Sequence, residues 1–155
     1  MAVMAGLGLT GILLVGVASV GAAPGDLDTT FSTDGKVTTD IGTTDAGRAV
    51  AIQADGKIVV AGFAQISGNY EFAVVRYGTD GTLDSSFSSD GIATVDVSSG
   101  HDFAYALAIQ TDGMIVVGGA TGVGGANTEF GLIRLTSSGI LDTGFSADGK
   151  IEFGV

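Results

Sequence analysis

The sequence lacks several residue types on which common folds and chemistries depend. It has no cysteine and no tryptophan, and one proline and one histidine in 155 residues. Without cysteine no disulfide can support the fold, so its stability has to come from a packed core. The single histidine, His101, has neither a second histidine nor a cysteine with which to form a metal cluster or a catalytic pair. We therefore predict no catalytic residue and expect His101 to be a solvated loop residue.

Basic residues are also scarce. Six lysines and arginines stand against 17 aspartates and glutamates, which gives a formal net charge of −11. Nucleic-acid binding and docking on anionic lipids both depend on lysine and arginine, so this balance disfavours both kinds of partner. We interpret the acidity as a means of keeping an apolar, β-rich chain soluble.

Aspartate supplies most of that acidity, and many aspartates precede a glycine. Asp-Gly is a strong hairpin signal, because a type I′ turn needs two successive residues at positive φ. The alternative is calcium, which carboxylates bind as hard oxygen ligands, although no D-x-D-x-D-G run is present. We predict turns and no cofactor, with calcium as the alternative. The Asp-Gly pairs begin at Asp34, Asp55, Asp80, Asp90, Asp112 and Asp148.

The N-terminal segment carries no charge over its first 23 residues. Small residues at Val20, Gly21 and Ala22 suit signal-peptidase cleavage before Ala23, although no lysine or arginine forms a basic start. The prediction is an apolar leader helix over 1–22 that acts as a signal peptide. The alternative is a membrane anchor, because about 20 apolar residues can span a bilayer. Either role predicts a protein that is secreted or at the cell surface, touching the membrane only through this leader.

The rest of the chain is a tandem repeat. The first copy reads GDLDTTFSTDGKVTTDIG, AVAIQADGKIVVAG and EFAVVRYGTD; the second reads GTLDSSFSSDGIATVDVS, ALAIQTDGMIVVGG and EFGLIRLTSS. A third begins with GILDTGFSADGKIEFGV. Repeats of this size cannot bury their apolar face alone and need copies alongside. The predicted organisation is one repeat over 23–80, a second over 81–138 and a partial third over 139–155.

Each copy contains four strand candidates separated by turn signals. Runs such as Ile58–Ala61 are apolar on both faces, which indicates a strand between two layers. Stacked antiparallel four-stranded units are the blades of a β-propeller, so we predict an all-β fold with two full blades and the start of a third at Lys150–Val155. One internally duplicated β-sandwich is the alternative. The candidates are 36–41, 48–53, 57–63 and 71–77, then 92–97, 105–110, 114–119 and 129–135.

A motif, Leu-Asp-x-x-Phe-Ser-x-Asp-Gly, opens every copy. Its aspartate can cap a short turn, and the flanking leucine and phenylalanine form an apolar pair. We predict that each pair is a plug between sheets rather than part of a catalytic loop. The pairs are Leu27 with Phe31, Leu83 with Phe87, and Leu141 with Phe145.

Two arginines interrupt apolar strands, Arg76 in FAVVRY and Arg134 in FGLIRL. A charge at such a position must be paired or reach solvent. Asp84 and Asp142 follow the arginines by eight residues, symmetrically about a predicted turn. We therefore predict hydrogen bonds of about 2.7–3.2 Å from Arg76 to Asp84 and from Arg134 to Asp142.

These residues resemble the delta-60 repeat family, whose units read G-x-LDxxFxxDGKVTTDxG, AVAIQxDGKIVVAG and FAVxRYxxDG. The resemblance covers about residues 25–155 and implies a secreted or surface-exposed bacterial protein built from β-propeller blades, without implying an active site. The second copy departs from the pattern where Ile92 and Met114 replace the lysines of the first copy. A binding role for those lysines is therefore doubtful.

The expected function is that of a structural or interaction surface outside the cytoplasm, and not of an enzyme. The alternatives are a calcium-stabilised adhesive array, or part of a propeller enzyme whose active site needs a complete ring. Expected partners are copies of the chain or further repeats, and a surface protein or glycan. Because two blades leave apolar faces open, we do not expect a stable closed monomer.

Overall fold

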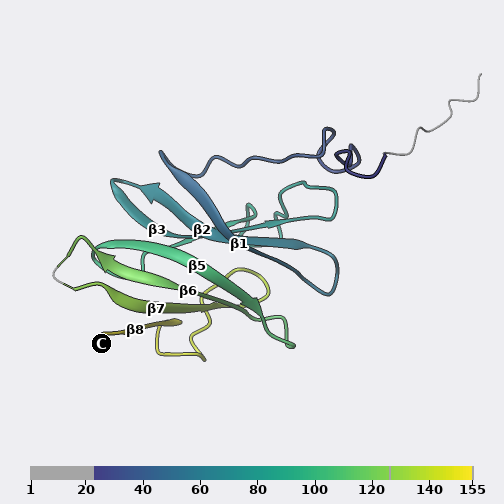
Figure 1. Ribbon diagram of the computed structural model, residues 1–155. Helices are drawn as coiled ribbons and strands as arrows, with labels where there is room; N and C mark the ends of the chain where they lie inside the picture. The colour runs from purple at the N-terminus through teal and green to yellow at the C-terminus, as the bar shows by residue number, and fades with distance from the viewer. Residues whose placement is uncertain (1–22, 126, 155) are drawn as a thin grey trace, which may run out of the picture.

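The computed structural model describes residues 23–125 and 127–154, which form an all-β fold of two four-stranded antiparallel sheets (Figure 1). The leader predicted over 1–22 lies outside the described residues. No helix in the described part is long and apolar enough to cross a membrane. The strands are β1 (Asp45–Ile52), β2 (Ile58–Ile66), β3 (Asn69–Tyr77), β4 (Ile92–Val95), β5 (His101–Ile109), β6 (Ile115–Val123), β7 (Glu129–Leu135) and β8 (Lys150–Phe153).

Each sheet is a simple meander. The strand order is β1-β2-β3-β4 in the first sheet and β5-β6-β7-β8 in the second, and all neighbours are antiparallel. The long strands of the two copies therefore lie in separate sheets and do not interleave. The predicted all-β fold of antiparallel four-stranded units is confirmed.

The prediction that 36–41 and 92–97 are the first strands of the sheets formed by their own copies is wrong. Residues 36–41 pair with no strand in the described part of the chain, whereas β4 from the second copy completes the first sheet beside β3. Likewise β8 does not begin a third sheet but pairs with β7. A strand forms only beside a partner, and each of these segments pairs with the long strand that precedes its motif. The sheets are thus offset by one strand from the sequence repeat.

The Asp-Gly turns are present, but they are not of type I′. At the β1–β2 hairpin the Gly56 amide donates to the Gln53 carbonyl at 2.9 Å, and the Gln53 amide donates to the Lys57 carbonyl at 2.8 Å. Gly56 has a φ of 84°, while Asp55 keeps a negative φ. A three-residue loop needs positive φ only at its last residue, whereas type I′ belongs to two-residue loops.

The aspartates act largely within turns. Nine of them accept a hydrogen bond at 2.9–3.1 Å from the amide two residues ahead, which fixes the local chain reversal. These are Asp28, Asp34, Asp55, Asp80, Asp84, Asp90, Asp112, Asp142 and Asp148.

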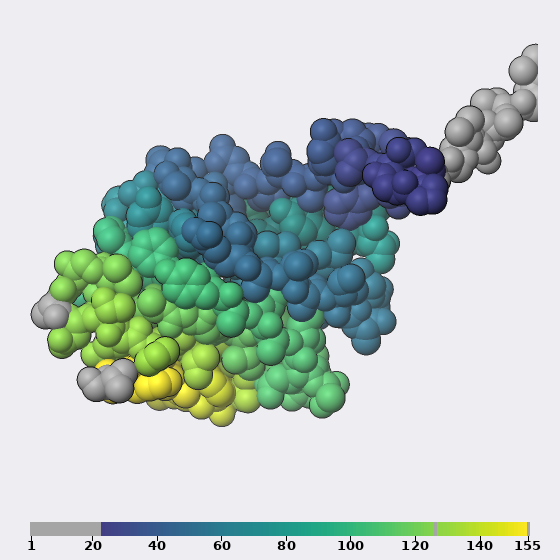
Figure 2. All heavy atoms as spheres, viewed as in Figure 1, coloured from purple at the N-terminus to yellow at the C-terminus, as the bar shows by residue number. Residues whose placement is uncertain are grey.

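The core lies between the two sheets. In the space-filling view the atoms of the first sheet rest directly on those of the second (Figure 2). Side chains alternate along a strand, so one side of β2 and β3 faces the second sheet and the other side faces away from it. Phe87, from the loop between β3 and β4, is also fully buried in this core. Other buried members of the core are Val59, Ala61, Phe72 and Val74 from the first sheet, and Ile115, Val117, Ile133 and Leu135 from the second.

Candidate functional site

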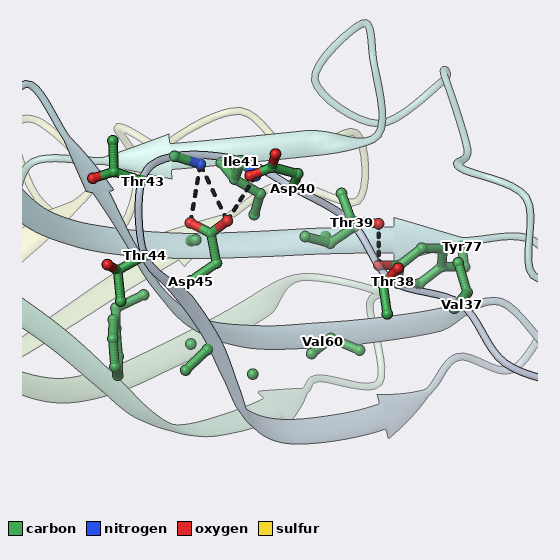
Figure 3. Close-up of a pocket in the computed structure, with 17 residues that line it drawn as sticks. Val37, Thr38, Thr39, Asp40, Ile41, Thr43, Thr44, Asp45, Val60 and Tyr77 are labelled. Atoms are coloured by element: carbon green, nitrogen blue, oxygen red, sulfur yellow. Dashed lines mark hydrogen bonds between the residues drawn. The ribbon is translucent and has the colours of Figure 1, made fainter.

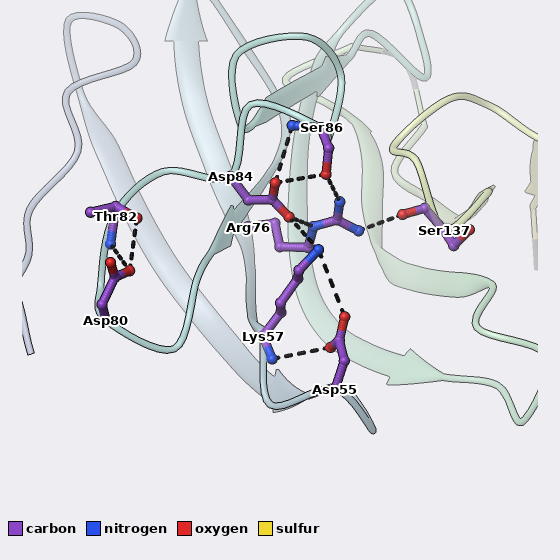
Figure 4. Close-up of polar contacts among 8 residues, drawn as sticks. All are labelled: Asp55, Lys57, Arg76, Asp80, Thr82, Asp84, Ser86 and Ser137. Carbon is purple, nitrogen blue, oxygen red and sulfur yellow. Dashed lines mark hydrogen bonds and ion pairs between the residues drawn. The ribbon is translucent and has the colours of Figure 1, made fainter.

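Arg76 joins the two sheets (Figure 4). It lies on the inner side of β3 and is 5% exposed. Its Nε donates to Asp84 Oδ2 at 2.7 Å, its Nη2 donates to Ser86 Oγ at 2.9 Å, and its Nη1 donates to the Ser137 carbonyl, which follows β7 in the second sheet. We call this group, Arg76, Asp84, Ser86 and Ser137, the arginine joint. Each of the three nitrogen atoms of the buried guanidinium donates a hydrogen bond in this group, and the bond to Ser137 links one sheet to the next.

Asp84 is held in its ionised form by these neighbours. The Ser86 hydroxyl donates to Asp84 Oδ1 at 2.7 Å, and Lys57 Nζ lies 3.0 Å from Oδ2. The hydrogen bond from Ser86, with Lys57 and Arg76, keeps the pKa of Asp84 far below its ordinary value of 3.8, although burial opposes this. The carboxylate is therefore charged throughout the neutral and mildly acidic range.

The depressed pKa of Asp84 predicts acid-sensitive stability. Its folded-state pKa lies below the unfolded one, so its stabilising contribution is complete above about pH 5 and is lost as the pH falls through about 4 and below. We expect the free energy of unfolding, measured with urea at a series of pH values, to fall across this range. Asp84→Asn should be less stable than the wild type at pH 7 but should lose less stability on acidification.

Two further carboxyl groups affect this pH profile: Asp142 provides the control variant, and Glu71 contributes in the opposite direction. The pKa of Asp142 is also lowered, mainly by a hydrogen bond from the Gly144 amide and by Arg134, so Asp142→Asn should flatten the profile less than Asp84→Asn. Burial raises the pKa of Glu71 in the folded protein. Protonation of Glu71 on acidification therefore raises the free energy of unfolding and partly offsets the loss from Asp84. Parallel profiles for wild type and Asp84→Asn would contradict the assignment.

The second copy repeats the ion pair but lacks the link to another sheet. Arg134 Nε donates to Asp142 Oδ2 at 2.7 Å, so both predicted arginine–aspartate hydrogen bonds are present. The Arg134 side chain is 23% exposed, against 6% for Arg76. Gly144 takes the place of Ser86, and no carbonyl from another sheet accepts from Arg134 within the described residues.

Two of the three motif phenylalanines lie beneath these arginines. The guanidinium carbon of Arg76 is 4.8 Å from the centre of the Phe87 ring, and that of Arg134 is 4.7 Å from the centre of the Phe145 ring. Phe87 also contacts Gly139, where a Cβ would lie 2.8 Å from its ring, so this turn requires glycine. The plug role predicted for Phe87 is therefore present in the structure.

The motif leucines do not all share that role. Leu27 is 53% exposed and Leu83 is 41% exposed, so the predicted burial of both is wrong, while Leu141 is partly buried against the core. Leu83 forms a backbone bridge with Tyr77, an edge pairing that leaves its side chain accessible. Phe31 and Phe145 are half-buried.

Backbone hydrogen bonds show that the first two motifs each dock onto the turn that opens the next copy. The Ser88 amide donates to the Ser138 carbonyl, and the Ser32 amide donates to the Asp80 carbonyl, both at 2.8 Å. The same contact thus occurs in both copies, in each case between residues of two loops. The motif is a connector between successive units.

Two segments contain the recurring parts of this arrangement, one from Gln53 to Phe87 and one from Gln110 to Phe145. Both match one family model, a domain of unknown function (DUF5122) beta-propeller. Each matched segment holds two long strands, the arginine, its aspartate and the motif phenylalanine. Two stacked antiparallel four-stranded sheets are consistent with propeller-like blades, and we call them the first and the second blade. No curated protein matched the sequence.

Asp102 is a structural residue of the blades that the sequence analysis missed. It is fully buried at the start of β5. Its carboxylate accepts from the Val97 and Ser98 amides at 2.8 and 3.0 Å and fixes the crossing from one blade to the next. Asp45 accepts from the Ile41 and Gly42 amides in the same way. The signal was available, because the two aspartates occupy the same place in both copies.

His101 is not the solvated loop residue that was predicted. It lies on β5, half-buried, and its Nδ1 accepts from the Tyr70 amide at 3.3 Å. The Tyr70 ring lies 5.0 Å from that of Phe103, and Phe103 lies 4.9 Å from Phe63 across the blades. His101 therefore belongs to an aromatic contact between blades.

A hollow of about 550 Å³ lies on the outer side of the first blade (Figure 3). Residues 37–47 cross this side, and the Thr39 and Tyr77 hydroxyls are 2.6 Å apart. Asp45, at its rim, is engaged by two backbone amides. Within the described residues no group of three or more histidine, cysteine, aspartate or glutamate side chains could hold a metal ion.

Proposed function

We propose that this chain is a delta-60-type repeat module, secreted or on the cell surface, whose blades serve as a structural or interaction surface and not in catalysis. The observation that carries the proposal is the arginine joint. Arg76 and Asp84, the recurring polar residues most suggestive of chemistry in the sequence, bind each other, and Arg76 also holds the first blade to the second.

The other recurring polar residues support the same role. Asp102 binds backbone amides where the chain crosses from the first blade to the second, Asp45 binds those just before β1, and the turn aspartates bind amides two residues ahead. Each of these carboxylates thus has a partner that explains its place in the repeat. An apolar N-terminal segment with small residues before Ala23 supports export.

The location is tested by expressing the complete chain with a C-terminal tag in a Gram-negative host. We expect the tagged protein in the periplasm or the medium, with a mature N-terminus at Ala23. A variant with Val20→Asp and Ala22→Asp, which removes the small residues required by signal peptidase, is the control and should retain the leader. Full-length wild-type protein in the cytoplasm would overturn the proposed location.

The same preparation tests the calcium alternative. We expect the thermal unfolding midpoint to be unchanged by EDTA, because nine turn aspartates already accept backbone hydrogen bonds. A calcium-stabilised array would instead unfold at a lower temperature in EDTA and recover with added calcium, since a ligand of the native state raises its stability. That outcome would replace the proposal with an adhesive calcium module.

A further inference from the structure

An apolar face lies on the side of the second blade that points away from the first. Phe130 is 57% exposed and Phe153 is 48% exposed, and their rings stack with centres 5.7 Å apart. Together with Tyr105 and Leu132 they line a hollow of about 530 Å³. We call these four residues the open face. Aromatic surface of this kind marks a binding region.

The repeat shows what this face does when it is covered. Phe130 and Leu132 occupy the places of Phe72 and Val74 in the first copy, in the matching segments EFGLIRL and EFAVVRY. Phe72 and Val74 are completely buried against the second blade. The open face is therefore the counterpart of a surface that already forms an interface within this chain.

The other half of that interface is exposed at the opposite side of the molecule. Val50 and Ile52 on β1 are 66% and 70% exposed. Their counterparts on β5, Leu107 and Ile109, are partly buried and packed against the core between the blades. The chain thus exposes both complementary halves of the contact that it makes internally.

We propose that the open face of one molecule binds the outer side of the first blade of another molecule of the same chain, head to tail. The second molecule then covers Phe130 and Phe153. This inference rests on the proposed function as a structural module and names its partner. The contact repeats the internal one, in which Arg76 donates to the carbonyl of Ser137. Thr79 in the first repeat corresponds to Ser137 in the second, so across the proposed contact Arg134 of one molecule donates to the Thr79 carbonyl of the other.

One segment has to yield for this contact to form. Residues 37–41 lie on the outer side of the first blade, in the place that β4 takes against the second blade. The segment GKIEF, which forms β8, is the repeat counterpart of GKVTT at 35–39. In the proposed contact β8 of one molecule would lie where residues 37–41 of the other molecule lie, and both segments cannot fit there. β8 is hydrogen-bonded to β7, whereas 36–41 pairs with no strand in the described part, so 36–41 is displaced.

The test measures self-association of the complete mature chain by sedimentation velocity over a range of protein and salt concentrations. We expect concentration-dependent assembly, strengthened by salt because each copy carries a formal charge of −11. Phe130→Asp should raise the dissociation constant by about 100-fold or more, because the substitution buries a charge in an apolar contact. Ile140→Asp is the matched control, because Ile140 is 63% exposed even beside the internal contact.

A second variant separates head-to-tail from face-to-face association. Val50→Asp damages the other half of the contact, so each variant alone should be monomeric, while a mixture with Phe130→Asp should form dimers through the one intact pair of surfaces. Normal assembly of Val50→Asp, or assembly of Phe130→Asp like the wild type, would overturn the proposal. A monomeric, folded wild type would also overturn it and would leave export and EDTA insensitivity, the tests of the proposed function, untouched.

Discussion

Replacing Arg76 by alanine is expected to lower the free energy of unfolding by about 3 kcal/mol, the low end of the range for breaking a buried ion pair. The change removes three hydrogen bonds and the contact with the Phe87 ring. The loss stays at the low end because Lys57 Nζ, 3.0 Å from Asp84, still partners the carboxylate. Urea unfolding followed by circular dichroism, in the Phe130→Asp background to keep the chain monomeric, measures it.

Arg134→Ala is the matched control for this prediction. Arg134 makes the same pair with Asp142, but its side chain is more exposed and it has no carbonyl partner from another blade within the described residues. Its loss should cost about 1 kcal/mol, as for exposed ion pairs. Equal costs at the two arginines would show that the hydrogen bond between blades contributes nothing to stability.

Replacing Phe87 by alanine is expected to cost about 3–5 kcal/mol, as for other fully buried phenylalanines. The ring is completely buried, contacts Gly139 of the second blade and lies beneath the Arg76 guanidinium. Because this one side chain touches both blades, we also expect faster hydrogen exchange in the strands of both. The measurements are urea unfolding and amide exchange.

Phe145→Ala provides the comparison at the same place in the repeat. Phe145 lies beneath Arg134 but is only half-buried, so its replacement should cost about 1 kcal/mol. A similar cost for Phe87 and Phe145 would mean that Phe87 does not connect the blades. Exchange that quickens in one blade alone would lead to the same conclusion.

The sequence predicts the arginine–aspartate pairs because a short turn fixes the distance between their positions. It does not predict the third partner of Arg76, because that partner is the backbone carbonyl of Ser137, which every residue type carries. The contribution of Asp102 was missed for a different reason. A single aspartate between two strands resembles the many turn aspartates, and only its recurrence as Asp45 distinguishes it.

The strand assignments fail where the fold depends on neighbours rather than on local pattern. Residues 36–41 and 92–97 have similar sequences, yet only the second segment forms a strand, because β3 lies beside it. The turn type fails for a local reason, since loop length and not the Asp-Gly pair decides whether one or two residues need positive φ. The repeat itself, read from the sequence, is sufficient to predict the stacking of the sheets.

The one-strand offset between repeat and blade has a consequence for how such a gene can change. Every blade receives its fourth strand from the following repeat, so duplication or deletion of one whole repeat recreates the same junction wherever the breakpoints fall. No new contact has to arise by mutation, because each inserted unit brings both halves of the interface with it. Recombination can therefore lengthen or shorten the array in whole-blade steps without an intermediate in which a sheet lacks its edge strand.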